Sequence, residues 1–326
     1  MNTALSAAPR RPYRWLAAPA AAAAAIGVGT GFASRRWRRD TDARLAAGGR
    51  LAATALGPIE HAETGSGAPV LVLHGTPGGY DQALAVAGLF AGSGVRVIAM
   101  SRPGYLGTPL SVSSTPAEQA DAATALVDHL QIDRTAVVGV SGGGGMAAVQ
   151  LALRHRGRVA RLVLWEAVTA AVAFGTDNLT RGPLTTDVAA WLMLRAFTVA
   201  PRLLVPPRLD ADPQALTRLG PVAASGFPLQ PRRDGIANDG VQARALPDSP
   251  LEEIDVPTLL VHGTEDTNVP YRVSEQAAQR IPGSRLVSVP GGDHTTTLVD
   301  TRGRDGHRAV PARQQVISHH AGGSFE

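Results

Sequence analysis

The chain has 326 residues, of which 44% are hydrophobic, so it can bury one large core or two smaller ones and is not a disordered protein. Its formal net charge of +4 is unevenly distributed: residues 1–50 hold nine arginines against two acids (+7), and the rest holds 22 arginines against 25 acids (−3). Residues 51–326 carry a net negative charge, so they give no indication of nucleic-acid binding. The absence of cysteine excludes disulfides, thiolate metal sites and a cysteine nucleophile.

The first feature along the chain is an uncharged run at residues 15–34, flanked by arginines on both sides. About twenty residues can cross a bilayer, but nine residues of this run are alanine, which is barely hydrophobic. We expect residues 1–50 to be a basic, alanine-rich leader that anchors the protein in a membrane through residues 15–34. An export signal and an inert leader are the alternatives, so the expected location is membrane-associated, with an exported or cytoplasmic protein as the other options.

From residue 51 the pattern alternates between apolar strands and helices. Strands are predicted at residues 51–55, 58–63, 69–73, 95–100, 135–140 and 161–165, with helices at residues 81–91, 115–130 and 146–154. Strands that alternate with helices of this length predict a parallel sheet covered on both faces. Ligands of such sheets bind at the carboxyl ends of the strands, where the glycine-rich segments of this chain are found.

A glycine-rich turn follows the predicted strand at 135–140. Gly139-Val-Ser-Gly-Gly143 fits the pattern G-x-S-x-G, and two more glycines precede a helix predicted to begin at Met146. A serine on a sharp strand-to-helix turn is backbone-strained and needs neighbours without a Cβ. The free N–H groups of the following helix would face a developing oxyanion. Gly144 and Gly145 lower helix propensity, which indicates either unusually close helix–strand packing or a looser first turn.

The alternation breaks between residues 168 and 250, where many prolines and short helical patterns predict a mostly helical insertion. The sheet resumes with strands at 256–262 and 284–289, separated by a helix at 271–281. The last residues are polar and unpatterned, apart from a short helix expected at Ala309–His319. The expected domains are a leader (1–50), a first core segment (51–167), a helical cap (168–250), a second core segment (251–300) and a polar tail (301–326).

The sequence contains five motifs in a recognisable order along the chain. They are His74-Gly75 with a glycine-rich loop, Ser101-Arg-Pro-Gly104, the Ser141 turn, Gly263-x-x-Asp266-x-x-Val-Pro270 and Gly292-x-His294. In these motifs the sequence resembles the α/β-hydrolase-fold serine hydrolases over about residues 51–297. The resemblance implies that fold, with a mostly parallel sheet and a cap over the active site. It also implies Ser141 as nucleophile, Asp266 as acid and His294 as base.

The chemistry of the residues agrees with these roles. A serine hydroxyl needs a base to remove its proton, and histidine is the side chain that titrates near neutrality. His294 follows the last predicted strand and can reach the same sheet edge, whereas His74 and His262 end strands and are expected to be packed structural residues. A carboxylate must orient the base. Asp266 is favoured over its neighbour Glu265 and over Glu166, where some family members place the acid.

The oxyanion hole is expected to use the backbone N–H of Gly142 and one from the loop after His74. Thr76 is the favoured second donor because Pro77 has no N–H. We expect no metal ion and no cofactor.

The substrate class is less clearly indicated. The leading hypothesis is hydrolysis of a carboxylic ester of a small acyl substrate, with an acyl-enzyme on Ser141. The alternatives are a carbon–carbon bond hydrolase, an aminopeptidase resembling the proline iminopeptidases, or a non-catalytic ligand-binding member of the fold. An aminopeptidase needs cap carboxylates to hold the substrate ammonium group, for which the candidates are Asp210, Asp212, Asp234 and Asp239. The oligomeric state is not predicted.

Overall fold

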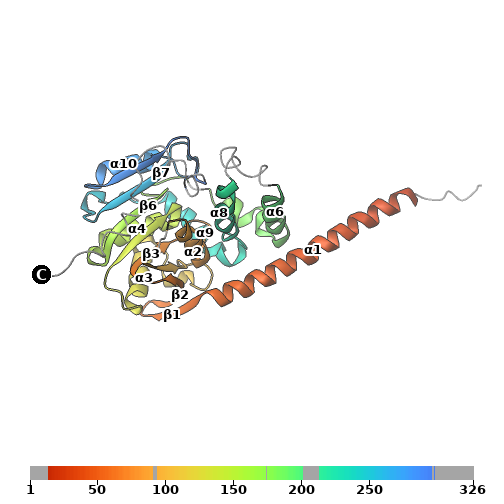
Figure 1. The fold of residues 1–326 in the computed structure, drawn as a ribbon, viewed down its shortest axis with the longest axis horizontal. Helices are drawn as coiled ribbons and strands as arrows, with labels where there is room; N and C mark the ends of the chain where they lie inside the picture. The colour runs from red at the N-terminus through yellow and green to blue at the C-terminus, as the bar shows by residue number, and fades with distance from the viewer. Residues whose placement is uncertain (1–13, 91–93, 174, 201–212, 296, 298–326) are drawn as a thin grey trace, which may run out of the picture.

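The computed structural model describes residues 14–90, 94–173, 175–200, 213–295 and 297. Eight strands form one sheet in the order β1-β2-β4-β3-β5-β6-β7-β8 (Figure 1). The strands are β1 (Arg50–Thr54), β2 (Gly57–Gly65), β3 (Ala68–Leu73), β4 (Val95–Met100), β5 (Thr135–Val140), β6 (Val159–Trp165), β7 (Thr258–Gly263) and β8 (Arg285–Val289). The pairs from β4 to β8 are parallel, and only β1–β2 and β2–β4 are antiparallel. The predicted mostly parallel sheet is confirmed.

Helices cover both faces of this sheet. One face packs against α3 (Pro116–His129), α4 (Ser141–Arg154) and α10 (Arg272–Arg280). The other packs against α2 (Tyr80–Phe90) and against Leu45, near the end of α1 (Arg14–Gly48). Between β6 and β7 lie α5 (Asp177–Arg181), α6 (Asp187–Val199), α8 (Pro213–Ala224) and α9 (Arg233–Arg244). Short 3₁₀ helices are η1 (Leu110–Val112), η2 (Arg156–Arg158), η3 (Pro183–Thr185), η5 (Gln230–Arg232) and η6 (Leu251–Glu253).

The central strands are apolar throughout because both of their faces are buried. In β3, Leu71 and Leu73 point into the core beneath α3 and α4, while Val70 and Val72 point into the core beneath α2. A strand with one solvent-exposed face would instead alternate apolar and polar residues. This continuous burial holds the carboxyl ends of β3, β5, β6 and β7 in register at one edge, where the catalytic candidates follow.

The N-terminal segment differs from the prediction. Residues 14–48 form one long helix, α1, which projects from the body (Figure 1). No helix in the described part of the chain is both long and apolar enough to cross a bilayer. The expected membrane anchor at residues 15–34, and the membrane-associated location with it, are therefore wrong. The physical reason is the alanine content of the run, since alanine contributes little to transfer into lipid.

The second half of α1 packs on the protein instead. Arg38 forms an ion pair with Asp187 of α6 at 3.0 Å, and Trp37 packs beside the cluster that includes Tyr105 and Phe227. The hydroxyl of Tyr80 donates to the carbonyl of Leu45 at 2.7 Å. The polar tail at 301–326, with the helix expected at Ala309–His319, lies outside the described residues. The division into domains stays a prediction.

Candidate active site

Three side chains from separate loops meet at the carboxyl edge of the sheet. Ser141 follows β5, Asp266 follows β7 and His294 follows β8. The Oγ of Ser141 lies 2.9 Å from Nε2 of His294, and Nδ1 of His294 lies 2.7 Å from Oδ2 of Asp266. An ionised carboxylate can only accept, so Nδ1–H donates to Asp266 and Nε2 is left to accept from the serine hydroxyl. The structure thus brings the predicted nucleophile, base and acid into one hydrogen-bonded chain.

The backbone at Ser141 is strained, as a serine on a sharp turn requires. Its φ is +54°, in the left-handed region that side chains other than glycine rarely adopt. A Cβ on Gly139 would lie 2.7 Å from the carbonyl oxygen of Gly144. Strain of this kind costs about 1–3 kcal/mol and is found mostly at functional sites. The surrounding packing therefore keeps Ser141 in a strained conformation that lowers the local stability.

The run of glycines after Ser141 forms the first turn of α4, which begins at Ser141 rather than at the predicted Met146. A Cβ on Gly144 would lie 2.5 Å from the carbonyl oxygen of His74 and closer still to that of Leu73. A Cβ on Gly145 would lie 2.5 Å from the Cβ of Ala167. Of the two explanations considered for this run, the contacts favour unusually close packing of helix on strand.

Gly144→Ala is therefore expected to destabilise the protein by about 1–3 kcal/mol, although alanine favours helix over glycine by about 1 kcal/mol. The added methyl group meets backbone atoms that cannot move aside. The matched control is Gly88→Ala in α2, where a Cβ meets nothing within 4 Å. That variant should gain about 1 kcal/mol. Chemical denaturation of both variants measures the difference, and equal stabilities would contradict the close-packing explanation.

The surroundings of Asp266 keep its carboxylate ionised. Its Oδ1 accepts from the backbone N–H groups of Asn268 at 2.8 Å and Val269 at 3.0 Å, and its Oδ2 lies 3.1 Å from Nε2 of His262. Burial alone would raise the pKa of Asp266, but hydrogen bonds from His262 and His294 hold that pKa below its usual value. His262, expected to be a packed structural residue, is fully buried and also contacts the carboxylate of Asp266.

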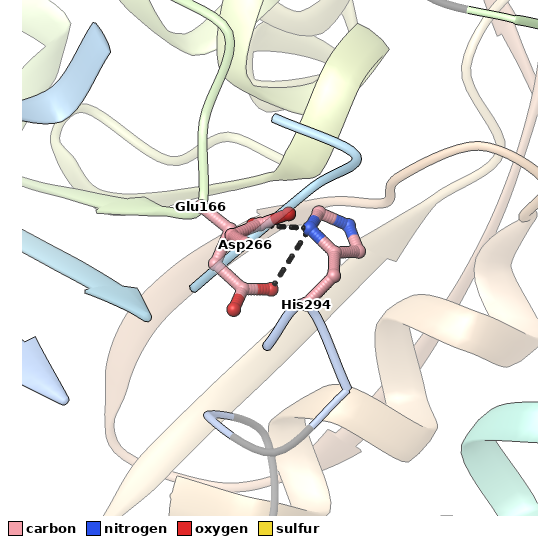
Figure 2. Close-up of side chains that lie close together, drawn as sticks. All are labelled: Glu166, Asp266 and His294. Atoms are coloured by element: carbon pink, nitrogen blue, oxygen red, sulfur yellow. Dashed lines mark hydrogen bonds and ion pairs between the residues drawn. The ribbon is translucent and has the colours of Figure 1, made fainter. Parts of the chain in front are cut away.

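A second carboxyl group, from Glu166, also faces His294. Its Oε2 lies 3.4 Å from Nδ1 of His294 (Figure 2). Burial would lower the pKa of His294, but the charges of Glu166 and Asp266 raise it above its usual value. One ligand atom from each of these three side chains lies within 4.8 Å of the others, so they are also the geometric candidates for a metal ion.

The loop after β3 lies directly against the serine. A Cβ on Gly75 would lie 2.9 Å from the Cβ of Ser141, so Thr76, the next residue, follows a backbone position in close contact with Ser141. Gly142, the other predicted oxyanion donor, is the second residue of α4, where the N–H groups have no partner within the helix. The geometry is compatible with the predicted pair, whose role in catalysis stays a prediction.

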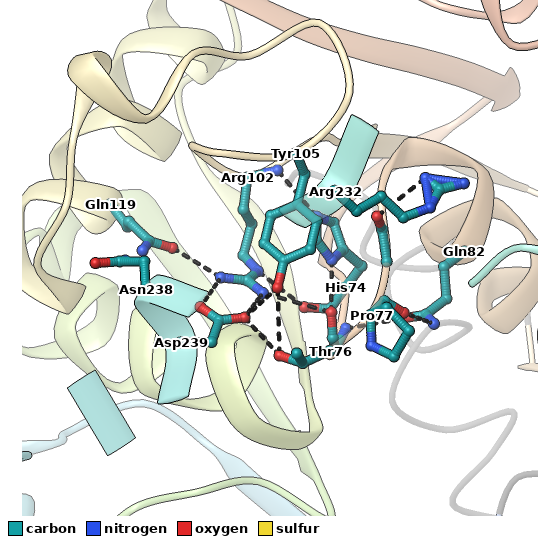
Figure 3. A network of polar contacts seen from close by, with 12 residues as sticks. His74, Thr76, Pro77, Gln82, Arg102, Tyr105, Gln119, Arg232, Asn238 and Asp239 are labelled. Atoms are coloured by element: carbon teal, nitrogen blue, oxygen red, sulfur yellow. Dashed lines mark hydrogen bonds and ion pairs between the residues drawn. The ribbon is translucent and has the colours of Figure 1, made fainter. Parts of the chain in front are cut away.

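A buried polar network holds this loop in place (Figure 3). Arg102, which follows β4 and is fully buried, donates to the carbonyl of His74 at 2.9 Å and to both carboxylate oxygens of Asp239 on α9 at 3.0 and 2.6 Å. The hydroxyls of Thr76 and Tyr105 each donate to Oδ2 of Asp239 at 2.5 Å. Asp239 therefore connects α9 to the loop that carries the predicted oxyanion donor.

Asp239→Asn is expected to lower the free energy of unfolding by about 3–5 kcal/mol, because it leaves the buried charge of Arg102 without its partner. The matched control is Asp121→Asn, which weakens partly exposed contacts with Arg154 and His155 and should cost less than about 1 kcal/mol. The measurement is urea denaturation of both variants. A loss at Asp239 no larger than that at Asp121 would show that the network contributes little.

Of the four acidic residues considered for an amino-group site, the two in the described part of the chain are not arranged for it. Asp239 is buried and already accepts from Arg102, Tyr105 and Thr76. Asp234 is exposed, and Asp210 and Asp212 lie outside the described residues. Sequence reasoning did not single out Arg102 as the partner of Asp239. The only signal was the position of Arg102 after a predicted strand, in the segment Ser101-Arg-Pro-Gly104.

The chain is similar to known hydrolases. A 2-hydroxymuconate semialdehyde hydrolase of Pseudomonas putida is 33% identical over 233 residues, covering 69% of this chain and 79% of that protein. A bifunctional esterase/perhydrolase of Acinetobacter calcoaceticus is 30% identical over 252 residues, covering 73% and 90%. The solved structure of an alpha/beta hydrolase fold protein from Nakamurella multipartita is 31% identical, covers 82% of this chain and 97% of its own, and has a TM-score of 0.71.

The sequence also matches the alpha/beta hydrolase family over residues 70–304, which is more than half of the chain. This range contains all five motifs and the three side chains that meet at the sheet edge. The chain therefore belongs to the alpha/beta hydrolase family.

Proposed function

We propose that the protein is a serine hydrolase that cleaves a carboxylic ester through an acyl-enzyme on Ser141. The observation that carries the proposal is the hydrogen-bonded chain from Ser141 Oγ through His294 to Asp266, at 2.9 and 2.7 Å. Its order of nucleophile, base and acid is what acyl transfer requires. The similarity to a bifunctional esterase/perhydrolase supports the same reaction class.

The residues would act in the following sequence. His294 Nε2 takes the proton of Ser141 as Oγ attacks the ester carbonyl carbon, and the imidazolium is stabilised by the carboxylate of Asp266. The N–H groups of Gly142 and Thr76 would stabilise the oxyanion of the tetrahedral intermediate. His294 returns the proton to the departing alcohol, leaving the acyl-enzyme. Water then attacks with the same base, which releases the carboxylic acid and restores Ser141.

The second candidate is hydrolysis of a carbon–carbon bond on the same residues. Its support is the 33% identity to a 2-hydroxymuconate semialdehyde hydrolase. The aminopeptidase alternative is weakened, because the carboxylate of Asp239 is already bonded to Arg102 and is not free for a substrate ammonium group.

The test is labelling of the purified protein with a fluorophosphonate probe, followed by assays with p-nitrophenyl esters and prolyl amides. We expect a covalent adduct on Ser141 and turnover of the esters but not of the amides. A protein that is folded yet unlabelled would contradict serine hydrolysis and favour the ligand-binding alternative. Labelling without turnover of any ester would move the proposal to the carbon–carbon bond hydrolase.

A further inference from the structure

We propose that Glu166 is a second acidic partner of the base, a positioning residue that holds the His294 ring together with Asp266 and sets the pH range in which the ring can accept a proton. This inference rests on the proposed function. The geometry points to it: Oε2 of Glu166 lies 3.4 Å from Nδ1 of His294, the same nitrogen that donates to Asp266 at 2.7 Å (Figure 2). The imidazole thus has two carboxyl groups on the side away from the serine.

The position of Glu166 is energetically unfavourable in two ways, through its backbone conformation and through the burial of its carboxyl group. It follows Trp165 at the end of β6, is only 1% exposed, and has a φ of +49°, in the left-handed region. A strained backbone position costs about 1–3 kcal/mol and persists only where the surroundings enforce it. Burying a carboxyl group costs more unless it has partners. A glycine would occupy this backbone position without strain and without a buried carboxyl group, so the glutamate side chain itself has a use.

Its carboxyl group is oriented by a short chain of hydrogen bonds. The hydroxyl of Thr297 donates to Oε1 of Glu166, and the indole N–H of Trp165 donates to the oxygen of Thr297 at 3.1 Å. This leaves Oε2 directed at His294. The orientation of the Glu166 carboxyl group toward His294 is therefore fixed by hydrogen bonds from its neighbours.

The two carboxyl groups differ in what stabilises their charge. Asp266 has donors from two backbone N–H groups and from His262, whereas Glu166 has the hydroxyl of Thr297. Burial raises the pKa of Glu166 to about 8; the charge of His294 and the hydrogen bond from Thr297 lower it, and the charges of Asp266 and Asp293 raise it by less than burial does. One imidazolium compensates only one of two close carboxylates. Asp266 is therefore the permanent anion, and Glu166 is the group whose charge changes with pH.

The charge on Glu166 affects the pKa of His294 in one direction. The charged groups that face His294 are Glu166 from the end of β6, Asp266 from the loop after β7 and Asp293 from its own loop. An ionised Glu166 stabilises the imidazolium, so it raises the pKa of His294 and delays the loss of its proton as pH increases. Removing that charge lowers the pKa of His294. The neutral ring, which is the form that activates Ser141, then exists at lower pH.

The experiment measures the rate of fluorophosphonate labelling of Ser141 as a function of pH, in the full-length chain. In Glu166→Gln the acidic limb of the profile should move to lower pH by about 1 pH unit. The matched control is Glu265→Gln, which removes an exposed negative charge next to Asp266 and should leave the limb in place. A second variant, Thr297→Val, removes the hydroxyl that stabilises the Glu166 carboxylate, so it should move the limb the same way by less.

The outcomes separate this inference from the function on which it rests. Wild-type protein that is not labelled at Ser141 would overturn the proposed function and the inference together. A labelled wild type with an unmoved limb in Glu166→Gln would overturn the inference alone, as would equal shifts in Glu166→Gln and Glu265→Gln. If Glu166→Gln does not fold, the pH profile of Thr297→Val tests the inference instead. An unchanged acidic limb in that variant would contradict the inference.

Discussion

Replacing Ser141 with alanine is expected to reduce turnover of any ester that the wild type cleaves by at least about a thousandfold, while the protein stays folded. The hydroxyl that lies 2.9 Å from His294 is the one nucleophile of the proposed reaction, so its removal leaves no atom to form the acyl-enzyme. Alanine keeps the size of the side chain and tolerates the same backbone strain as serine. The readouts are steady-state kinetics and thermal melting.

The control for this variant is Ser284→Ala, whose hydroxyl donates to the carbonyl of Ala278 away from the site. Its turnover should match the wild type. Substantial residual activity in purified Ser141→Ala would remove this serine from the mechanism. Loss of folding in the variant would mean that the hydroxyl is structural.

Asp266→Asn is expected to lower kcat by about 10³- to 10⁴-fold. The asparagine amide can donate to Nδ1 of His294, which favours the tautomer with a proton on Nε2, and that nitrogen can then no longer accept from Ser141. Glu166→Gln should reduce kcat far less, because Asp266 still accepts from Nδ1 at 2.7 Å.

The matched control is again Glu265→Gln, one residue away and exposed, which should behave as the wild type. Ester turnover of the three variants at a single alkaline pH, where the base is neutral, measures the comparison. The acid assignment fails if Glu166→Gln is the crippling change and Asp266→Asn is not.

The sequence predicted most of the fold because its strands have unambiguous patterns. Each central strand is a short apolar run bounded by turn residues, and the helix start at Thr115 follows from its capping box, in which Thr115 and Glu118 bond to each other's backbone N–H. The three residues at the sheet edge were identified because each follows such a strand in a recognisable motif. Their catalytic roles stay predictions.

Two helical segments that the sequence pattern did not predict share one physical cause. The first turn of α4 and the whole of α9 contain glycines, which lower helix propensity. In α9 a Cβ on Gly235 would collide with the ring of Tyr105, and one on Gly240 would collide with Thr176. In α4 the same holds for Gly144 and the end of β3. Close packing with distant residues overrides the local preference, and distant contacts cannot be read from one sequence.

The contacts of α9 limit how a substrate can enter. Asp239 ties this helix to Arg102, and Arg232, the residue before the helix, pairs with Asp81 at 2.8 Å and donates to the carbonyl of Gly78 at 3.2 Å. Moving α9 away would leave the buried charges of Arg102 and Asp81 without their partners, at a cost of several kcal/mol for each. Helix α9 is thus fixed against the loop after β3, which lies next to Ser141. A movement that admits a substrate would then have to leave α9 in place; among the described helices between β6 and β7, α5, α6 and α8 carry neither of these buried ion pairs.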